Sequence, residues 1–213
     1  MCREALRALA RAAFGSGRGV VRLQASRDGA GGVHLVGVPR ALGPEGAPWT
    51  ARVAAFAHHG PAPWGGAKVS GHPLLALARD AARTAGADEA LLLDAAGYLV
   101  EGSRSSLVLV TADGALVTPP LRRGGVSGVA RGLLLQAERE LHEADVSREG
   151  LATARELVAV NAVRFAVPVT TLDGRPVGNG RPGPAAARLA RLLDGLAGDG
   201  ADRPSAGSRR TGG

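Results

Sequence analysis

The sequence predicts a mixed α+β or α/β protein, in which a partial small N-terminal lobe precedes a larger, β-rich domain with flanking helices. Residues 89–117 contain short apolar runs separated by glycine-containing turns, which is typical of a β-meander. Residues 72–86 and 129–142 repeat apolar side chains at helical spacing. The turn-forming stretch GPAPWGG, residues 60–66, separates this part from the first 60 residues and predicts the boundary between the two lobes.

The small α/β lobe is predicted over residues 1–62. A helix is expected from Arg3 to Phe14, where arginines alternate with alanines and leucines. Three β-like runs follow, with glycine- and proline-rich turns between them: residues 20–23, 33–36 and 52–56.

The large domain is predicted over residues 63–196. Its first helix starts after His72 and ends at Gly86, and the meander follows. A glycine-rich turn (GGVSG, residues 124–128) leads into the second helix, expected to run from Val129 to His142. Two strands (157–160 and 165–169) and a last helix (185–196) complete this domain, and residues 197–213 have so little to bury that we expect a disordered tail.

Composition argues against several classes of function. The net charge of +7 comes from arginines spread along the whole chain, and aromatic residues make up only 3%, so nucleic-acid binding is not expected. No apolar run approaches the roughly 20 residues of a membrane span, so we expect no membrane partner and a cytoplasmic protein. The single cysteine, Cys2, and the scattered histidines predict neither an internal disulfide nor a metal site.

The chain contains one lysine, Lys68, and every other residue of its 26 Lys and Arg is arginine. Lysine can lose its proton near neutral pH and form an imine, whereas arginine does neither. Lys68 is therefore a candidate nucleophilic amine; the alternative interpretation is a stray surface lysine.

Three features together indicate pyridoxal phosphate as the cofactor: Lys68, the carboxylate of Glu101 at a strand end, and the glycine-rich helix start over residues 124–131. They offer an imine partner, an anion that keeps the pyridine nitrogen protonated, and backbone N–H groups for a phosphate.

Three other motifs are not interpreted as functional sites. The dinucleotide-like glycines of residues 178–183 are interrupted by Pro182 and followed by Pro184. Serines after Glu101 lack the Gly-x-Ser-x-Gly elbow of hydrolases. The His58-His59 pair has no ligand partner at helical spacing and is interpreted as a turn or interface feature.

Four blocks of the sequence resemble the class IV aminotransferase family, the fold-type IV pyridoxal-phosphate enzymes. That family includes branched-chain and D-amino-acid aminotransferases and 4-amino-4-deoxychorismate lyase. The similarity extends from Lys68 to Leu193, and its most specific part is the block DEALLLDAAGYLVEGSRSSLVLVTADGALVTPPL. The blocks are residues 88–121, 125–131, 161–169 and 173–184.

The resemblance implies a fold-type IV architecture with a pseudobarrel large domain, a homodimer, and a small-molecule amino substrate. It also implies roles for individual residues. Lys68 would form the Schiff base, and Glu101 would face the pyridine nitrogen. Phosphate contacts would come from Gly128, Val129, Ala130, Asn161 and Ala162, and Arg164 would bind substrate.

The chain also departs from the family pattern. Ala130 and Ala162 stand where threonine is frequent, so contacts there come from backbone N–H groups alone, and Ser106 stands where asparagine is usual. The family's opening strands and its His-x-x-Arg segment have no counterpart in residues 1–60. A shortened, non-catalytic homologue is therefore the alternative of another class.

Among the family's activities, the sequence favours the lyase that gives p-aminobenzoate and pyruvate. Pro73 lies five residues after Lys68, where branched-chain transaminases tend to carry tyrosine, and residues 161–164 look more like lyase members. The alternative is a branched-chain or D-amino-acid aminotransferase.

Overall fold

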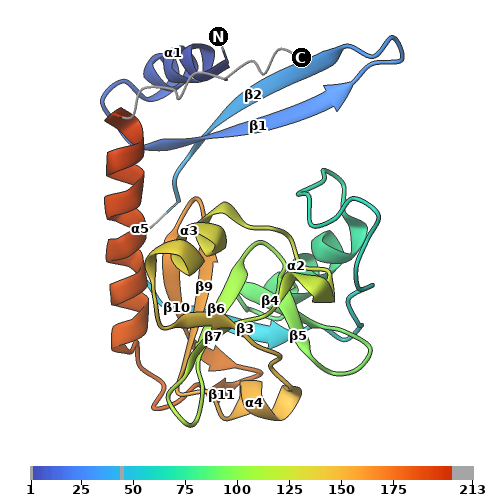
Figure 1. Cartoon of the computed structure of the whole chain (residues 1–213), viewed down its shortest axis with the longest axis vertical. Helices are drawn as coiled ribbons and strands as arrows, with labels where there is room; N and C mark the ends of the chain where they lie inside the picture. The colour runs from blue at the N-terminus through green and yellow to red at the C-terminus, as the bar shows by residue number, and fades with distance from the viewer. Residues whose placement is uncertain (1, 44–45, 203–213) are drawn as a thin grey trace, which may run out of the picture. The chain divides into compact units, whose positions relative to one another are not determined.

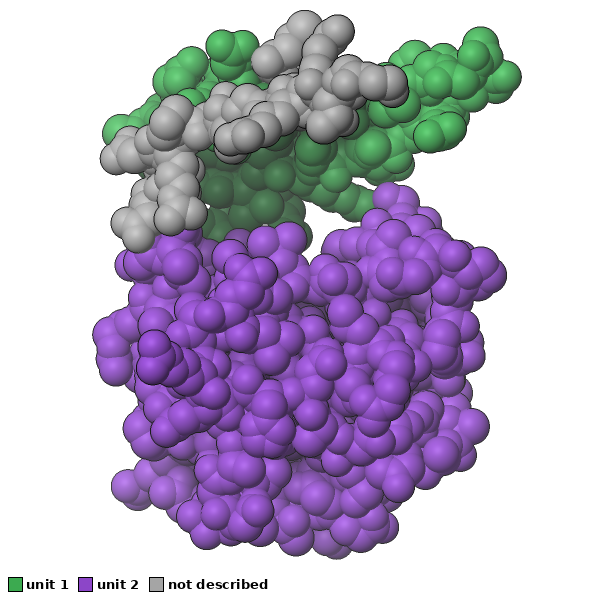
Figure 2. Space-filling model, in the orientation of Figure 1, with its two compact units in different colours: residues 1–47 green, residues 48–213 purple. Residues whose placement is uncertain are grey.

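A computed structural model describes residues 2–43 and 46–202, and the side chains of residues 3–43 and 46–197. The chain forms two compact units, residues 1–47 and 48–213, which Figure 2 colours separately. This division lies before the boundary near residue 62 that we expected, because the strand Trp49–Val53 is hydrogen-bonded inside the sheet of the larger unit. Residues 203–213 of the expected tail lie outside the described part of the chain, and residues 197–202 belong to the last helix.

The small unit consists of helix α1 (Cys2–Phe14) and the antiparallel ribbon of β1 (Gly19–Arg27) and β2 (Val33–Ala41). Both strands are longer than the β-like runs that predicted them, because the hairpin pairs in register over nine residues of each strand. At the turn, the Asp28 carboxylate accepts hydrogen bonds from backbone N–H groups and contacts His34. Helix α1 packs on the ribbon at Gly37, where an added Cβ would lie 2.8 Å from Leu9.

The larger unit is built on one nine-stranded sheet, seen in Figure 1. The order is β5-β4-β3-β10-β9-β6-β7-β8, with β11 paired to β10. Pairing is parallel for β3 with β4 and β10 and for β7 with β8, and antiparallel elsewhere. The strands are β3 (Trp49–Val53), β4 (Glu89–Leu93), β5 (Leu99–Gly102), β6 (Ser106–Val110), β7 (Leu116–Thr118), β8 (Leu141–Glu143), β9 (Glu156–Asn161), β10 (Phe165–Leu172) and β11 (Arg175–Pro176).

Both faces of this sheet are buried, which explains why its strands are almost continuously apolar. Successive side chains of a strand point to opposite faces. In β6, accordingly, Leu107 and Leu109 pack in one core cluster, which β4, β5 and β9 share, and Val108 packs in another with α3 and α5. In β4, Leu92 turns away from that first cluster to pack against α2.

The three helices that the sequence predicted for the larger unit are present, with one correction, and a fourth short helix is added. They are α2 (Pro73–Thr84), α3 (Val129–Ala137), α4 (Arg148–Ala152) and α5 (Pro184–Asp202), besides the single 3₁₀ turn Leu121–Arg123. The helix expected to run to His142 ends at Ala137, and Leu141–Glu143 instead forms β8. Leu141 lies on the helical stripe, yet it pairs in parallel with Leu116, and its side chain is buried in the core cluster that contains Leu116 and Leu134. Among the described residues, no helix is long and apolar enough to cross a membrane.

Candidate active site

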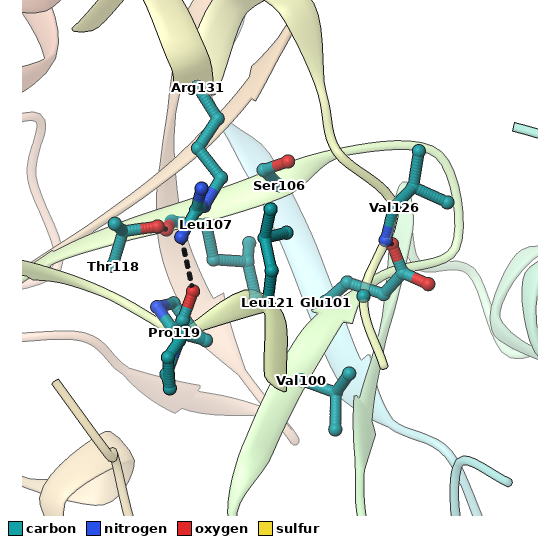
Figure 3. A pocket seen from close by; sticks show the side chains of 11 residues that line it. Val100, Glu101, Ser106, Leu107, Thr118, Pro119, Leu121, Val126 and Arg131 are labelled. Carbon is teal, nitrogen blue, oxygen red and sulfur yellow. Dashed lines mark hydrogen bonds between the residues drawn. The ribbon is translucent and has the colours of Figure 1, made fainter. Parts of the chain in front are cut away.

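The Glu101 carboxylate is the centre of the candidate site. Strand β5 is at the edge of the sheet, where Glu101 pairs with Leu92 of β4. Only 5% of Glu101 is exposed. Its Oε2 accepts a hydrogen bond from the N–H of Val126 at 2.9 Å, and its Oε1 lies 3.4 Å from Nε2 of His58. Figure 3 shows the carboxylate directed at the Val126 backbone. The carboxylate is therefore held by the glycine-rich turn that the sequence singled out.

The same turn is bound to the segment that carries Lys68. Gly124 has φ of 100°, and a Cβ there would lie 2.3 Å from the carbonyl of Gly60, so only glycine permits this approach. The Ser127 N–H donates to the Gly66 carbonyl at 2.8 Å. Lys68 follows two residues later, outside any helix or strand, with an exposed side chain. The structure thus brings the lysine segment and the carboxylate to the same glycine turn.

The start of α3 offers backbone donors without a side-chain cap. Gly128 is the N-cap residue, in extended conformation, and no side chain accepts from the first turn. Helix N-termini of this kind favour anions, because their first N–H groups have no partner within the helix. Val129 is 69% exposed, whereas Ala130 is buried beside Val160 and Ala166. The helix start therefore packs against the strands that flank the second predicted phosphate segment.

That second segment is a tight turn built by Asn161. Its Oδ1 accepts hydrogen bonds from the N–H groups of Val163 and Arg164, each at 2.9 Å. Phe165 follows with φ of 59°, a left-handed conformation that is unusual for a side chain of this size. Ala162 is exposed and Arg164 is half-buried. The Asn161 oxygen therefore serves the turn, and contacts from Ala162 to a ligand stay a prediction for its backbone N–H.

A second buried carboxylate, Glu89, supports the β5–β6 connection that follows Glu101. Glu89 is fully buried and accepts hydrogen bonds from the hydroxyls of Ser103 at 2.5 Å and Ser105 at 2.7 Å. Burial raises the pKa of Glu89, against the opposing effect of these hydrogen bonds. These two serines therefore have a structural role in fixing the strand end at Glu101.

A small cavity beside Glu101 has about 210 Å³ of empty space, which includes the solvent at its mouth (Figure 3). Besides Glu101, its walls include Ser106, Gly125 and Arg131. Arg131 donates to the Pro119 carbonyl at 2.8 Å and pairs with Glu143. Lys68, Ala162 and Arg164 do not line it. In the described part of the chain, no group of three or more His, Cys, Asp or Glu is arranged to hold a metal ion.

His58 is a site residue that the sequence interpretation missed. It is 3% exposed and touches Glu101, and its ring also lies 4.4 Å from that of His59. His59 in turn contacts His72 and Trp64. Two adjacent histidines in a loop carry no local signal of this contact, because it depends on the folding of residues 58–60 against β5.

The fold is that of the fold-type IV aminotransferases. Residues 1–172 match the family described as "Amino-transferase class IV". The chain belongs to this family, which confirms the resemblance found in the sequence.

Named relatives support the transaminase branch of the family. The curated branched-chain-amino-acid aminotransferase of Escherichia coli (strain K12) is 35% identical over 135 residues, 61% of this chain and 43% of that protein. Its crystal structure superimposes with a TM-score of 0.77 at 26% identity, covering 92% of this chain and 70% of the other. The branched-chain amino acid aminotransferase of T.th., complexed with N-(5'-phosphopyridoxyl)-L-glutamate, superimposes with a TM-score of 0.77 at 27% identity. The match covers 95% of this chain and 71% of the other.

Two conclusions follow from these comparisons. Pyridoxal phosphate, the cofactor expected from the sequence, is the family's cofactor, and a derivative of it is present in the T.th. complex. The relatives are named as branched-chain aminotransferases, so they favour our alternative interpretation over the lyase. The chain spans less than half the length of the curated relative described above.

Proposed function

We propose that this chain binds pyridoxal phosphate and takes part in transamination of a branched-chain amino acid. The observation that carries the proposal is the buried Glu101 carboxylate, fixed by the turn that also binds the Lys68 segment. The donor set fits the cofactor, because an anion, a primary amine and uncapped helix N–H groups match its ring nitrogen, aldehyde and phosphate. The names of the curated relatives and of the solved structures, branched-chain aminotransferases, support this choice of substrate class.

Each residue has a defined task in this proposal. When bound, pyridoxal phosphate supplies an electron sink for the substrate's α-carbon. The Lys68 amine would hold the aldehyde and, once displaced by substrate, move the proton at that carbon. Glu101 would accept a hydrogen bond from the ring nitrogen. Backbone N–H groups of Val129, Ala130 and Ala162 would bind the phosphate, and Arg164 the substrate carboxylate.

Because the chain has a single lysine, a cofactor label on a lysine side chain can only be on Lys68. The protein would be mixed with pyridoxal phosphate, reduced with borohydride, digested and mapped by mass spectrometry. We expect the label on the peptide containing Lys68. Lys68→Arg is the matched control, since it keeps the positive charge but cannot form an imine. A label confined to the terminal amine, or equal labelling of the control, would contradict the assignment.

The substrate class is tested by activity assays of the protein with pyridoxal phosphate bound. We expect amino transfer from leucine, isoleucine or valine to 2-oxoglutarate. The second candidate, release of pyruvate from aminodeoxychorismate, is favoured by Pro73 five residues after Lys68 and by residues 161–164. Pyruvate release without amino transfer would replace our proposal with the lyase. A chain that loses all cofactor on dialysis would support the non-catalytic homologue.

We also propose that the chain forms a homodimer, as the family resemblance implied. Light scattering after size exclusion should give twice the mass of 21.5 kDa. A monomeric mass would contradict this part of the proposal.

A further inference from the structure

The tautomer of His58 follows from its neighbours. The N–H of Gly60 donates to Nδ1 of His58 at 3.1 Å, so this nitrogen carries a lone pair. A neutral imidazole then has its proton on Nε2. That nitrogen lies 3.4 Å from Oε1 of Glu101, and the two side chains are 1% and 6% exposed. His58 therefore presents an N–H group to the carboxylate inside the protein.

His58 belongs to a cluster of three histidines. Its ring lies 4.4 Å from that of His59, whose Nε2 is 2.9 Å from Nε2 of His72. Only one proton fits between two nitrogens at this distance, so one of these two rings donates and the other accepts. Burial lowers the pKa of His72, and the two neighbouring histidines lower it further. Of the three rings, His58 is the one recorded in contact with Glu101.

Glu101 thus has a neighbour at each oxygen: the Val126 N–H donates to Oε2 at 2.9 Å, and Nε2 of His58 lies 3.4 Å from Oε1. A carboxylate that pairs with a ring nitrogen needs a fixed orientation as well as a charge. We propose that His58 is a positioning residue, whose Nε2–H orients the Glu101 carboxylate for the cofactor ring. The role given to Glu101 rests on the proposed function, whereas the contact between the two side chains does not.

Three variants separate positioning from simple support of the fold. His58→Leu keeps the volume and removes the donor, and His58→Gln keeps a donor at similar reach. His59→Gln is the matched control, because His59 is the adjacent histidine and the contact recorded for Glu101 is with His58.

The measurements are pyridoxal phosphate affinity, the pH midpoint of the bound cofactor's visible absorption, and the melting temperature. We expect H58L to bind the cofactor about tenfold more weakly, the size of one hydrogen bond to a charged group, and to shift the pH midpoint by about one unit. H58Q should stay within about threefold of the wild type, and H59Q should match it. If H58L lowers only the melting temperature, with affinity and pH midpoint unchanged, the positioning role is overturned.

A cofactor-free measurement keeps this inference distinct from the proposed function. In ¹⁵N-histidine NMR of the full chain without cofactor, His58 should show the Nε2–H tautomer, and Glu101→Gln should change its ring shifts. If the wild type binds no pyridoxal phosphate, the proposed function fails, and these spectra still decide the contact. A His58 protonated at Nδ1, or ring shifts insensitive to E101Q, would overturn the inference.

Discussion

The β1–β2 ribbon and the sheet of the larger unit use similar apolar sequences with opposite results. In the sheet, apolar side chains on both faces are buried against helices or other strands. In the ribbon, five large apolar side chains are about half exposed or more: Leu23, Val33, Leu35, Val36 and Val38. A two-stranded ribbon with one helix has too few partners to cover its apolar residues. β-propensity therefore gives strands in both places, whereas packing partners decide which of them have a core.

The difference bears directly on the site, because fixed geometry requires packed support. Glu101 and the glycine turn lie in the larger unit. There, the hydrogen bond from Ser127 N–H to the Gly66 carbonyl joins the turn to residues 60–66, and the bond from Val126 N–H joins it to Glu101. Two glycines in close contacts also differ between the units. Gly124 faces backbone atoms, and Gly37 faces the tip of a flexible leucine.

The largest expected contrast is between Leu109→Ala in the sheet and Leu35→Ala in the ribbon. Leu109 is fully buried, and its truncation should lower the free energy of unfolding by about 4 kcal/mol. Leu35 is 50% exposed, and its truncation should cost less than about 0.5 kcal/mol. Both tryptophans, Trp49 and Trp64, lie in the larger unit, so fluorescence-detected urea unfolding reports on it, and amide hydrogen exchange reports on residues 19–41. Equal losses would contradict the comparison.

A smaller difference in stability loss is expected between alanine substitutions at Gly124 and Gly37. Gly124→Ala adds a Cβ that would lie 2.3 Å from the Gly60 carbonyl at a φ of 100°, so we expect a loss of about 3 kcal/mol. Gly37→Ala would meet the end of the Leu9 side chain, which can move, and should cost about 1 kcal/mol. G124A should also weaken cofactor binding, which G37A should leave unchanged. Thermal unfolding with and without pyridoxal phosphate checks both expectations.

The subtlest effect is a pair of opposite pH dependences within the larger unit. Burial raises the pKa of Glu89 above its ordinary 4.5, so its contribution to stability is present below that pH and is lost as pH rises. The hydrogen bond from Arg131 lowers the pKa of Glu143, so its contribution is present above 4.5 and is lost as pH falls. The free energy of unfolding of E89Q and of E143Q, measured across pH and compared with the wild type, should therefore change its slope against pH in opposite directions. Slopes of the same sign would show that one assignment is wrong.

Much of the fold followed from local patterns. Alternating or continuous apolar runs identified the strands, and helical stripes identified α1, α2 and α5, because burial of one face imposes those periods on the sequence. Two details did not follow. Leu141–Glu143 continues a helical stripe but forms β8, and Trp49–Val53 joins the larger sheet, because in both cases the decisive hydrogen bonds come from strands distant in the chain.

By itself, the sequence determined the kinds of chemical group available: one amine at Lys68, a carboxylate at Glu101, and a glycine turn before α3. Side-chain chemistry is a property of the residue, so it can be read without a structure. Only the tertiary structure decided that His58 contacts Glu101 and that Glu89 is, like Glu101, a carboxylate buried away from water. Burial and contact depend on which distant segments pack together, and no neighbouring residue in the chain encodes that.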